Sequence, residues 1–242
     1  MNRLRNLAAL LLGCTVQLLL VSASNAHAQT VDDTGLWLGL FSRGDISLES
    51  HETSSSRLRW WFDGHARFFD DTDGFGQSIV RPGIGYALTD SATVWAGYGW
   101  IRTSPASGSD FDEHRVWQQV TWSRELQSFT LGFRSRLEQR FLETDSDTGW
   151  RFRQLLSARR PLEFAPHFSL VVWDELFVHL NDTNWGAHRG FDQNRIFLGF
   201  GWKPVRCSQS RVEIGYLNQY VDRRRRDDLS NHLIAINFYP SL

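Results

Sequence analysis

Arginine and glutamate side chains recur at every second position along several segments of the chain. The clearest segment is residues 128–142, where Arg134, Arg136, Glu138 and Arg140 share one face. An arginine fork can bridge two carboxylates at once and stays charged when partly buried, so this spacing favours a network of ion pairs. The same pattern extends the predicted network to Arg67, Arg81, Glu113, Arg115, Arg151, Arg153, Glu175, Arg195 and Glu213.

Two interpretations of this network stay open. In the first, the side chains form a packed polar core that braces the protein. In the second, a narrow passage keeps a positive excess, because the network has nine arginines against five acids once Asp63 is counted. Such a passage would favour anions.

Enzymatic chemistry has less support in the residue spacing. The chain has no G-x-S-x-G motif, and Ser135 and Ser157 lie in mid-segment without a recognisable partner. A lipid- or lipopolysaccharide-modifying enzyme at the outer rim therefore stays as an alternative, and the preferred interpretation is non-enzymatic. No metal site or cofactor is predicted, since His179, Asp182 and His188 lack the tight spacing of a ligand set.

A run of four arginines forms a second candidate site: Arg223, Arg224, Arg225 and Arg226. In an outer loop of an exported protein, the natural ligand for such a run is the phosphate of lipopolysaccharide. A solvated loop, partly neutralised by the two aspartates that follow, is the competing interpretation. The formal net charge of -1 argues against a general nucleic-acid partner.

The first residues are typical of an export signal. Two arginines precede an apolar stretch over residues 7–21, and an A-x-A cleavage site follows at residues 26–28. Residues 1–28 are therefore predicted to be a cleaved Sec signal peptide, and residues 29–242 a single mature domain. A lipoprotein signal with an acylated Cys14 is the alternative.

The mature chain alternates with a period of two, as β-strands do. In residues 128–142 the face opposite the arginines carries Phe129, Leu131, Phe133, Leu137 and Phe141. The connections alternate in length as well, which is typical of a transmembrane barrel with short periplasmic turns and longer outer loops. The sequence thus predicts an all-β fold, a closed antiparallel transmembrane β-barrel.

The strand count depends on the residues before the first clear strand. Ten strands follow from residue 57, and an even total is expected if both termini are periplasmic. Residues 34–50 then form either a hairpin around Arg43-Gly44-Asp45, giving twelve strands, or a lumenal segment, giving ten. Twelve is preferred. Pro82 falls in a predicted mid-strand, where we expect a bulge or a locally broken ladder.

A soluble periplasmic β-sandwich would also alternate, so alternation does not by itself place the chain in lipid. Three features favour a membrane: segments of about 10 to 15 residues, closure of the sheet, and aromatic residues near segment ends. The aromatic residues are Trp60, Trp100, Trp122, Trp150, Trp202 and Tyr239. The predicted location is the bacterial outer membrane, with its lipids, lipopolysaccharide and the barrel-assembly machinery as partners; the oligomeric state is left open.

Several segments carry a resemblance to a known family. They are residues 81–86 (RPGIGY), 96–100 (AGYGW), 113–119 (EHRVWQQ), 134–140 (RSRLEQR), 173–177 (WDELF) and 193–195 (QNR). With them the chain resembles, over nearly the whole mature length, the proteobacterial domain-of-unknown-function family 2490. The resemblance implies an outer-membrane β-barrel, and it carries no established activity or catalytic residues.

Overall fold

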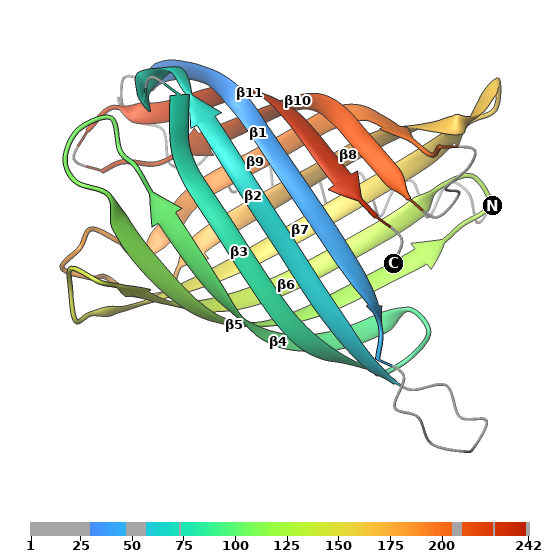
Figure 1. The fold of residues 1–242 in the computed structure, drawn as a ribbon, viewed down its shortest axis with the longest axis horizontal. Coiled ribbons are helices and arrows are strands. Elements are labelled where there is room, and N and C mark those ends of the chain that lie inside the picture. Colours follow the sequence, from blue (N-terminus) through green and yellow to red (C-terminus); the bar gives the residue numbers. More distant parts are fainter. Residues whose placement is uncertain (1–29, 47–56, 73, 205–209, 225, 241–242) are drawn as a thin grey trace.

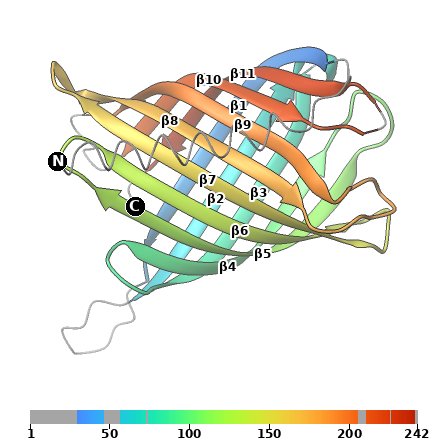
Figure 2. The same ribbon diagram turned by 180° about the vertical axis from the view of Figure 1, so that it is seen from behind.

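A computed structural model describes residues 30–46, 57–72, 74–204, 210–224 and 226–240. These residues form one sheet that closes into a barrel of tilted strands (Figures 1 and 2). The strands are β1 (Thr30–Asp45), β2 (Leu58–Phe69), β3 (Gly74–Ala87), β4 (Ala92–Thr103), β5 (Phe111–Glu125), β6 (Thr130–Leu142), β7 (Thr148–Leu162), β8 (Ala165–His179), β9 (Gly190–Trp202), β10 (Arg211–Val221) and β11 (Asp228–Tyr239). A short 3-10 helix, Asp70–Thr72, connects β2 and β3. None of the helices in the described ranges is long and apolar enough to cross a membrane.

Each strand pairs with its neighbour in the chain in antiparallel fashion, and β1 closes the barrel by pairing in parallel with β11 (Figure 1). The predicted barrel is confirmed, and a single closed sheet excludes the two-sheet sandwich. The preferred count of twelve strands is wrong, and so is ten, because the described strands number eleven. We expected an even number of strands because a barrel closed by an antiparallel pair needs one. A barrel closed by a parallel pair, as here, can have an odd number of strands.

The first strand also explains why the predicted hairpin is wrong. Residues 43–45 lie inside β1, where Gly44 is the register partner of Trp60 on β2. A Cβ atom on Gly44 would lie 2.6 Å from the indole nitrogen of Trp60. The glycine therefore makes room for a ring that crosses it, and does not form a turn. Of the predicted residues 46–50, only Ile46 is described.

The connections differ in length between the two ends of the barrel, although the prediction is wrong for two of them, residues 70–73 and 203–210. Residues 88–91, 126–129 and 163–164 form short turns at one end, which we call the short-turn end. Residues 104–110, 143–147, 180–189 and 222–227 form longer connections at the opposite, long-loop end. Three connections depart from this rule: residues 70–73 form a short one at the long-loop end, and residues 46–57 and 203–210, which are only partly described, form longer ones at the short-turn end. The strands between them are 11 to 16 residues long.

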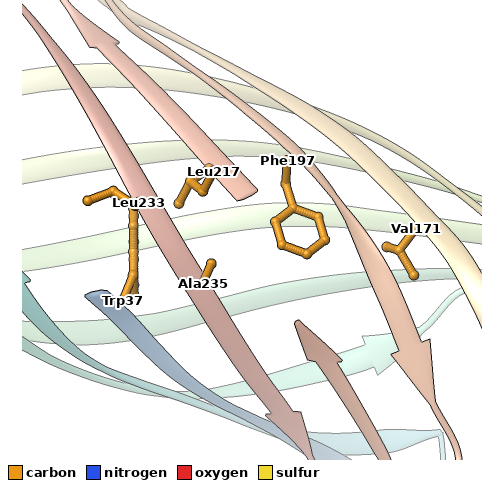
Figure 3. Packing of buried hydrophobic residues seen from close by; sticks show 6 residues of the cluster. All are labelled: Trp37, Val171, Phe197, Leu217, Leu233 and Ala235. Atoms are coloured by element: carbon orange, nitrogen blue, oxygen red, sulfur yellow. The ribbon is translucent and has the colours of Figure 1, made fainter. Parts of the chain in front are cut away.

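The outer face of the barrel is apolar and the inner face is mostly polar. Ile84 and Ile234 are 66% and 61% exposed, and many other large apolar side chains on alternate positions are exposed as well. Two apolar clusters lie among the inward side chains. One contains Trp37, Val171, Phe197, Leu217, Leu233 and Ala235 (Figure 3), and the other Trp61, Trp95 and Trp117.

The ladder between β3 and β4 is broken at Pro82, as predicted. Pairing skips Arg81 and Pro82 and resumes without a change of register, so there is no bulge. Proline has no N–H to donate across the strands, and the indole nitrogen of Trp117 donates to the carbonyl of Tyr98 at 3.1 Å at this point of β4. The ring reaches that carbonyl by lying over Gly97, where a Cβ atom would come within 2.3 Å of it.

Candidate functional site

Glu138 on β6 lies at the centre of the arginine network inside the barrel. Its side chain is fully buried, with Arg151 and Arg153 each 2.7 Å from one of its oxygens. Three further guanidinium groups lie 3.7 Å from these oxygens, those of Arg81, Arg115 and Arg136. The sheet register brings Glu138 and Arg151 together, because the two residues are directly opposite each other on β6 and β7. One carboxylate thus faces five arginines.

Glu113 holds a second group of arginines toward the long-loop end. Both oxygens of this carboxylate accept hydrogen bonds from Arg115, at 2.7 and 3.0 Å, and from Arg140, at 2.5 and 3.0 Å. Arg115 and Arg140 are themselves register partners on β5 and β6. Two like charges placed opposite each other repel, so the shared carboxylate is what makes this pairing favourable.

Glu175 and Asp63 extend the network around the barrel wall. Glu175 accepts hydrogen bonds from Arg134 at 2.8 Å and from Arg153 at 2.7 Å. Asp63 accepts one from Arg81 at 2.6 Å, and His65 lies 3.3 Å from the same oxygen. Of the predicted carboxylates, only Glu213 lies outside the network. It is buried near the short-turn end, where it pairs with Arg211 at 2.7 Å.

The network contains one carboxylate that the alternation did not indicate. Asp192 lies 3.1 Å from Arg151 and 3.4 Å from His179. Strict alternation along β9 places Gln193 and Arg195 inward and therefore Asp192 outward. The register of β8 and β9 shifts at this point, since Phe177 pairs with Gln193 and the next residue of β8 skips Asp192. A bulge of this kind re-aims a side chain, which is how Asp192 reaches the lumen.

The network is not neutral overall. Its arginines are the nine predicted from the sequence, and its carboxylates are Asp63, Glu113, Glu138, Glu175 and Asp192, an excess of four positive charges. Arg67 and Arg195 account for part of this excess, because no described carboxylate oxygen lies within 4.0 Å of either guanidinium. Both lie over aromatic rings instead. Arg67 lies 3.6 Å from the ring centre of Trp37, and Arg195 lies 4.7 Å from the same ring.

Two cavities occupy the lumen on either side of the network. The larger, about 740 Å³, lies toward the short-turn end and is lined by Trp61, Trp95 and Arg211 among others. The smaller, about 300 Å³, lies toward the long-loop end and is lined by Gln77 and Glu113 among others. Four side chains border both cavities, and we call them the arginine layer: Arg67, Arg81, Arg153 and Arg195.

The connection between β8 and β9 covers part of the smaller cavity. Trp185 lines this cavity, donates from its indole nitrogen to the carbonyl of Asp147 at 3.0 Å, and lies 4.9 Å from the guanidinium of Arg140. The connection is held in shape by Asp182, which accepts the backbone N–H of Arg189 at 2.9 Å. This hydrogen bond and the neighbouring His188 lower the pKa of Asp182. This connection therefore places Trp185 in the wall of the smaller cavity.

The four-arginine run lies in the connection between β10 and β11, at the long-loop end. The side chain of Arg223 donates to the backbone carbonyl of Asp227 at 2.7 Å, and the backbone N–H of Arg223 donates to the carboxylate of Asp228 at 3.0 Å, so the loop folds back on itself. Arg224 donates to the carbonyl of Arg189 at 3.1 Å and links two long loops. Arg224 and Arg226 are exposed, whereas Arg225 lies outside the described residues.

One outward-facing cluster bears on the enzymatic alternative. On the outer face of the barrel near the long-loop end, Tyr216 lies 2.5 Å from Nδ1 of His232, and Asp32 and Ser230 lie 3.2 and 3.4 Å from Nε2. In a serine–histidine–aspartate relay, the nucleophile and the acid contact opposite ring nitrogens. Here Ser230 and Asp32 share one nitrogen, so the cluster is not such a relay. Within the described ranges, no group of three or more His, Cys, Asp or Glu side chains gathers to hold a metal ion.

Comparisons with solved structures find barrels of modest similarity. The NanC porin matches with a TM-score of 0.45 at 16% identity, covering 82% of this chain and 93% of that one. LpxR from Salmonella typhimurium matches with a TM-score of 0.43 at 8% identity, covering 81% and 85%. Outer-membrane expressed OmpT of Vibrio cholerae has a TM-score of 0.41 at 14% identity, covering 75% and 66%.

Sequence comparisons are more specific. An uncharacterized protein of Methylorubrum extorquens is 30% identical over 223 residues, which cover 91% of this chain and 93% of the relative. The family described as "Protein of unknown function (DUF2490)" matches residues 34–230. This match spans most of the barrel, from β1 into β11, and confirms the resemblance noted in the sequence. The chain therefore belongs to the DUF2490 family.

Proposed function

We propose that the protein is a non-enzymatic outer-membrane β-barrel whose lumen is a narrow path favouring anions. The observation that carries this proposal is the arginine layer, because the four side chains that border both lumenal cavities are all arginines. Arg81 and Arg153 are paired with carboxylates, whereas Arg67 and Arg195 have no carboxylate oxygen of the described residues within 4.0 Å. A net positive lumen lowers the energy of an entering anion and raises that of a cation. The alternative is a lumen plugged by its own ion pairs, which the burial of the arginine layer favours, whereas the excess of nine arginines over five carboxylates favours the path.

The outer face supports the membrane part of this proposal. Exposed isoleucine, leucine, valine and aromatic side chains cover alternate positions on the outside of the strands. Contiguous apolar surface of this extent is unfavourable in water and suits the hydrocarbon core of a bilayer. Export by the Sec route through residues 1–28 and insertion by the barrel-assembly machinery belong to the same proposal, and residues 1–28 lie outside the described residues.

Conductance in a planar bilayer tests the proposed path. The refolded mature protein, shown to be folded by an SDS-gel band that shifts on heating, is expected to give discrete steps. In a salt gradient the reversal potential should have the sign of anion selectivity. Arg195→Gln, which removes one charge from the arginine layer, is expected to weaken this selectivity. Arg160→Gln is the control, because Arg160 is 63% exposed and lies outside the network.

Silence from a folded preparation would contradict the path and make the network a structural plug. Cation-selective steps would contradict it more directly, since the lumenal charge has the opposite sign. The selectivity is assigned to the lumen only if Arg195→Gln changes the reversal potential more than Arg160→Gln does.

We further propose that the four-arginine run contacts phosphate groups of lipopolysaccharide. The exposed Arg224 and Arg226 lie at the long-loop end, which is the outer end of a barrel with short periplasmic turns. Replacing residues 223–226 with four serines is expected to leave the heat-modifiable band unchanged and to reduce the lipopolysaccharide that co-purifies in detergent. Equal retention by the variant and the wild type would remove this proposal.

A further inference from the structure

We infer that Arg67 and Arg195, stacked on Trp37, form a saturable binding site for one oxyanion of the carboxylate or phosphate class. The site lies where the two lumenal cavities meet. It rests on the proposed function and deepens it, because it gives the anion path a specific stopping point. The binding site can nevertheless exist in a barrel that does not conduct.

The geometry brings the two guanidinium groups to one place from distant strands. Arg67 comes from β2 and Arg195 from β9, and both lie over the ring of Trp37 on β1, at 3.6 and 4.7 Å from its centre. The two guanidinium carbons are therefore at most about 8 Å apart. Where the two groups share one face of the ring they are closer than this maximum, and a single oxyanion can then accept charge-assisted hydrogen bonds of about 2.8 Å from both.

Both arginines are buried and have unused donors. Arg67 and Arg195 are 7% and 6% exposed, and the Nε–H group of each has no hydrogen-bond acceptor within the described structure. Arg67 donates once, to the side chain of Gln77 at 2.6 Å, whereas Arg195 has only aromatic rings beneath it, Trp37 and Phe177. Glu175 is the register partner of Arg195 on β8, but no carboxylate oxygen of the described residues lies within 4.0 Å of either guanidinium. A buried charge without a directly paired counterion is costly, so an anion that enters here reduces an existing penalty.

The surroundings favour an oxyanion over a halide. A guanidinium presents several N–H groups in a fixed plane and matches the paired oxygens of a carboxylate or phosphate. The aromatic ring holds both planes in position. Neutral amides complete the wall on the side of the smaller cavity, where Gln77, Gln193 and Gln219 all line the space. They add no negative charge to the wall, although Gln77 already accepts one hydrogen bond from Arg67 and the Glu113 carboxylate lines the same cavity.

Thermal unfolding of the refolded mature protein in detergent tests the site. Phosphate and acetate are titrated separately at constant ionic strength, with chloride as the background anion. We expect a saturable rise in Tm with at least one of the two oxyanions, and the comparison shows which class is preferred. Arg67→Gln and Arg195→Gln should each weaken the apparent affinity by about tenfold or more, since a charge-assisted pair of hydrogen bonds is lost. Arg160→Gln should leave the affinity unchanged.

The unliganded variants give a second, independent readout. If Arg195 carries an uncompensated charge, Arg195→Gln should raise the Tm in oxyanion-free buffer, whereas a purely structural arginine would lower it when removed. A Tm that responds equally to chloride and to both oxyanions would overturn the site, as would identical titrations of wild type and both variants. A saturable rise without bilayer conductance would keep the site and reject the path. Bilayer conductance without a saturable rise in Tm would keep the path and reject the site.

Discussion

Replacing Glu138 with glutamine is expected to destabilise the folded barrel by about 3–5 kcal/mol. The carboxylate is fully buried, and the guanidinium groups of five arginines lie within 3.7 Å of its oxygens. Glutamine keeps the shape of the side chain but removes the charge, so those arginines would repel one another with no central anion. Reversible urea unfolding in lipid vesicles would measure the loss of free energy.

A surface glutamate provides the matched control for this experiment. Glu163 lies 3.7 Å from Arg160, and its side chain is 92% exposed. Exposed pairs contribute at most about 1 kcal/mol, so Glu163→Gln should change the unfolding free energy very little. A Glu138→Gln effect as small as that of Glu163→Gln would mean that water or anions already compensate the central arginines, and the lumen would then be wetter than the contacts indicate.

Trp117→Ala is expected to destabilise the barrel by about 3–5 kcal/mol. The side chain has no exposed surface, it packs against Trp61, and Arg136 lies 4.6 Å from its ring. Its indole nitrogen also donates to the carbonyl of Tyr98 beside Pro82. Trp117→Phe keeps most of the volume and loses the donor, so it isolates that hydrogen bond, at about 1–3 kcal/mol.

A double-mutant cycle checks that the ring and the glycines beneath it are coupled. A Cβ atom on Gly83 would lie 2.5 Å from the ring of Trp117. Gly83→Ala should therefore be destabilising in the wild type and much less so in the Trp117→Ala background. Additive effects of the two substitutions would show that the ring does not depend on Gly83 for its space.

The alternation of residue types predicted much of the candidate site, and its limits have identifiable causes. The alternation of side chains between the two faces of a strand depends only on that strand. This is why Arg136, Glu138 and Arg153 face inward as predicted. Pairing across the lumen is not local. The contact between Arg81 on β3 and Glu138 on β6 depends on strand tilt and closure, which no single segment encodes.

Two errors came from local irregularities that the alternation could not reveal. The bulge beside Asp192 turns the side chain of this one residue from the outer face to the inner face, which adds a carboxylate to the network. Arg43-Gly44-Asp45 has the composition of a turn, but its glycine makes room for the ring of Trp60 within a continuous strand. In both cases a neighbouring strand determines the outcome. Glycine in a strand is therefore an ambiguous signal until the side chains across from it are known.

The parallel pairing of β1 with β11 has a consequence for the orientation of the chain. Thr30 pairs with Asp228 and Leu40 with Phe238, so both strands run from the long-loop end to the short-turn end. The first described residue and the last described strand residue, Tyr239, therefore lie at opposite ends of the barrel. In a bilayer, these two ends would lie in different compartments. An epitope joined just before Thr30 and one joined after Tyr239 would then be reached by antibodies from opposite sides of the membrane.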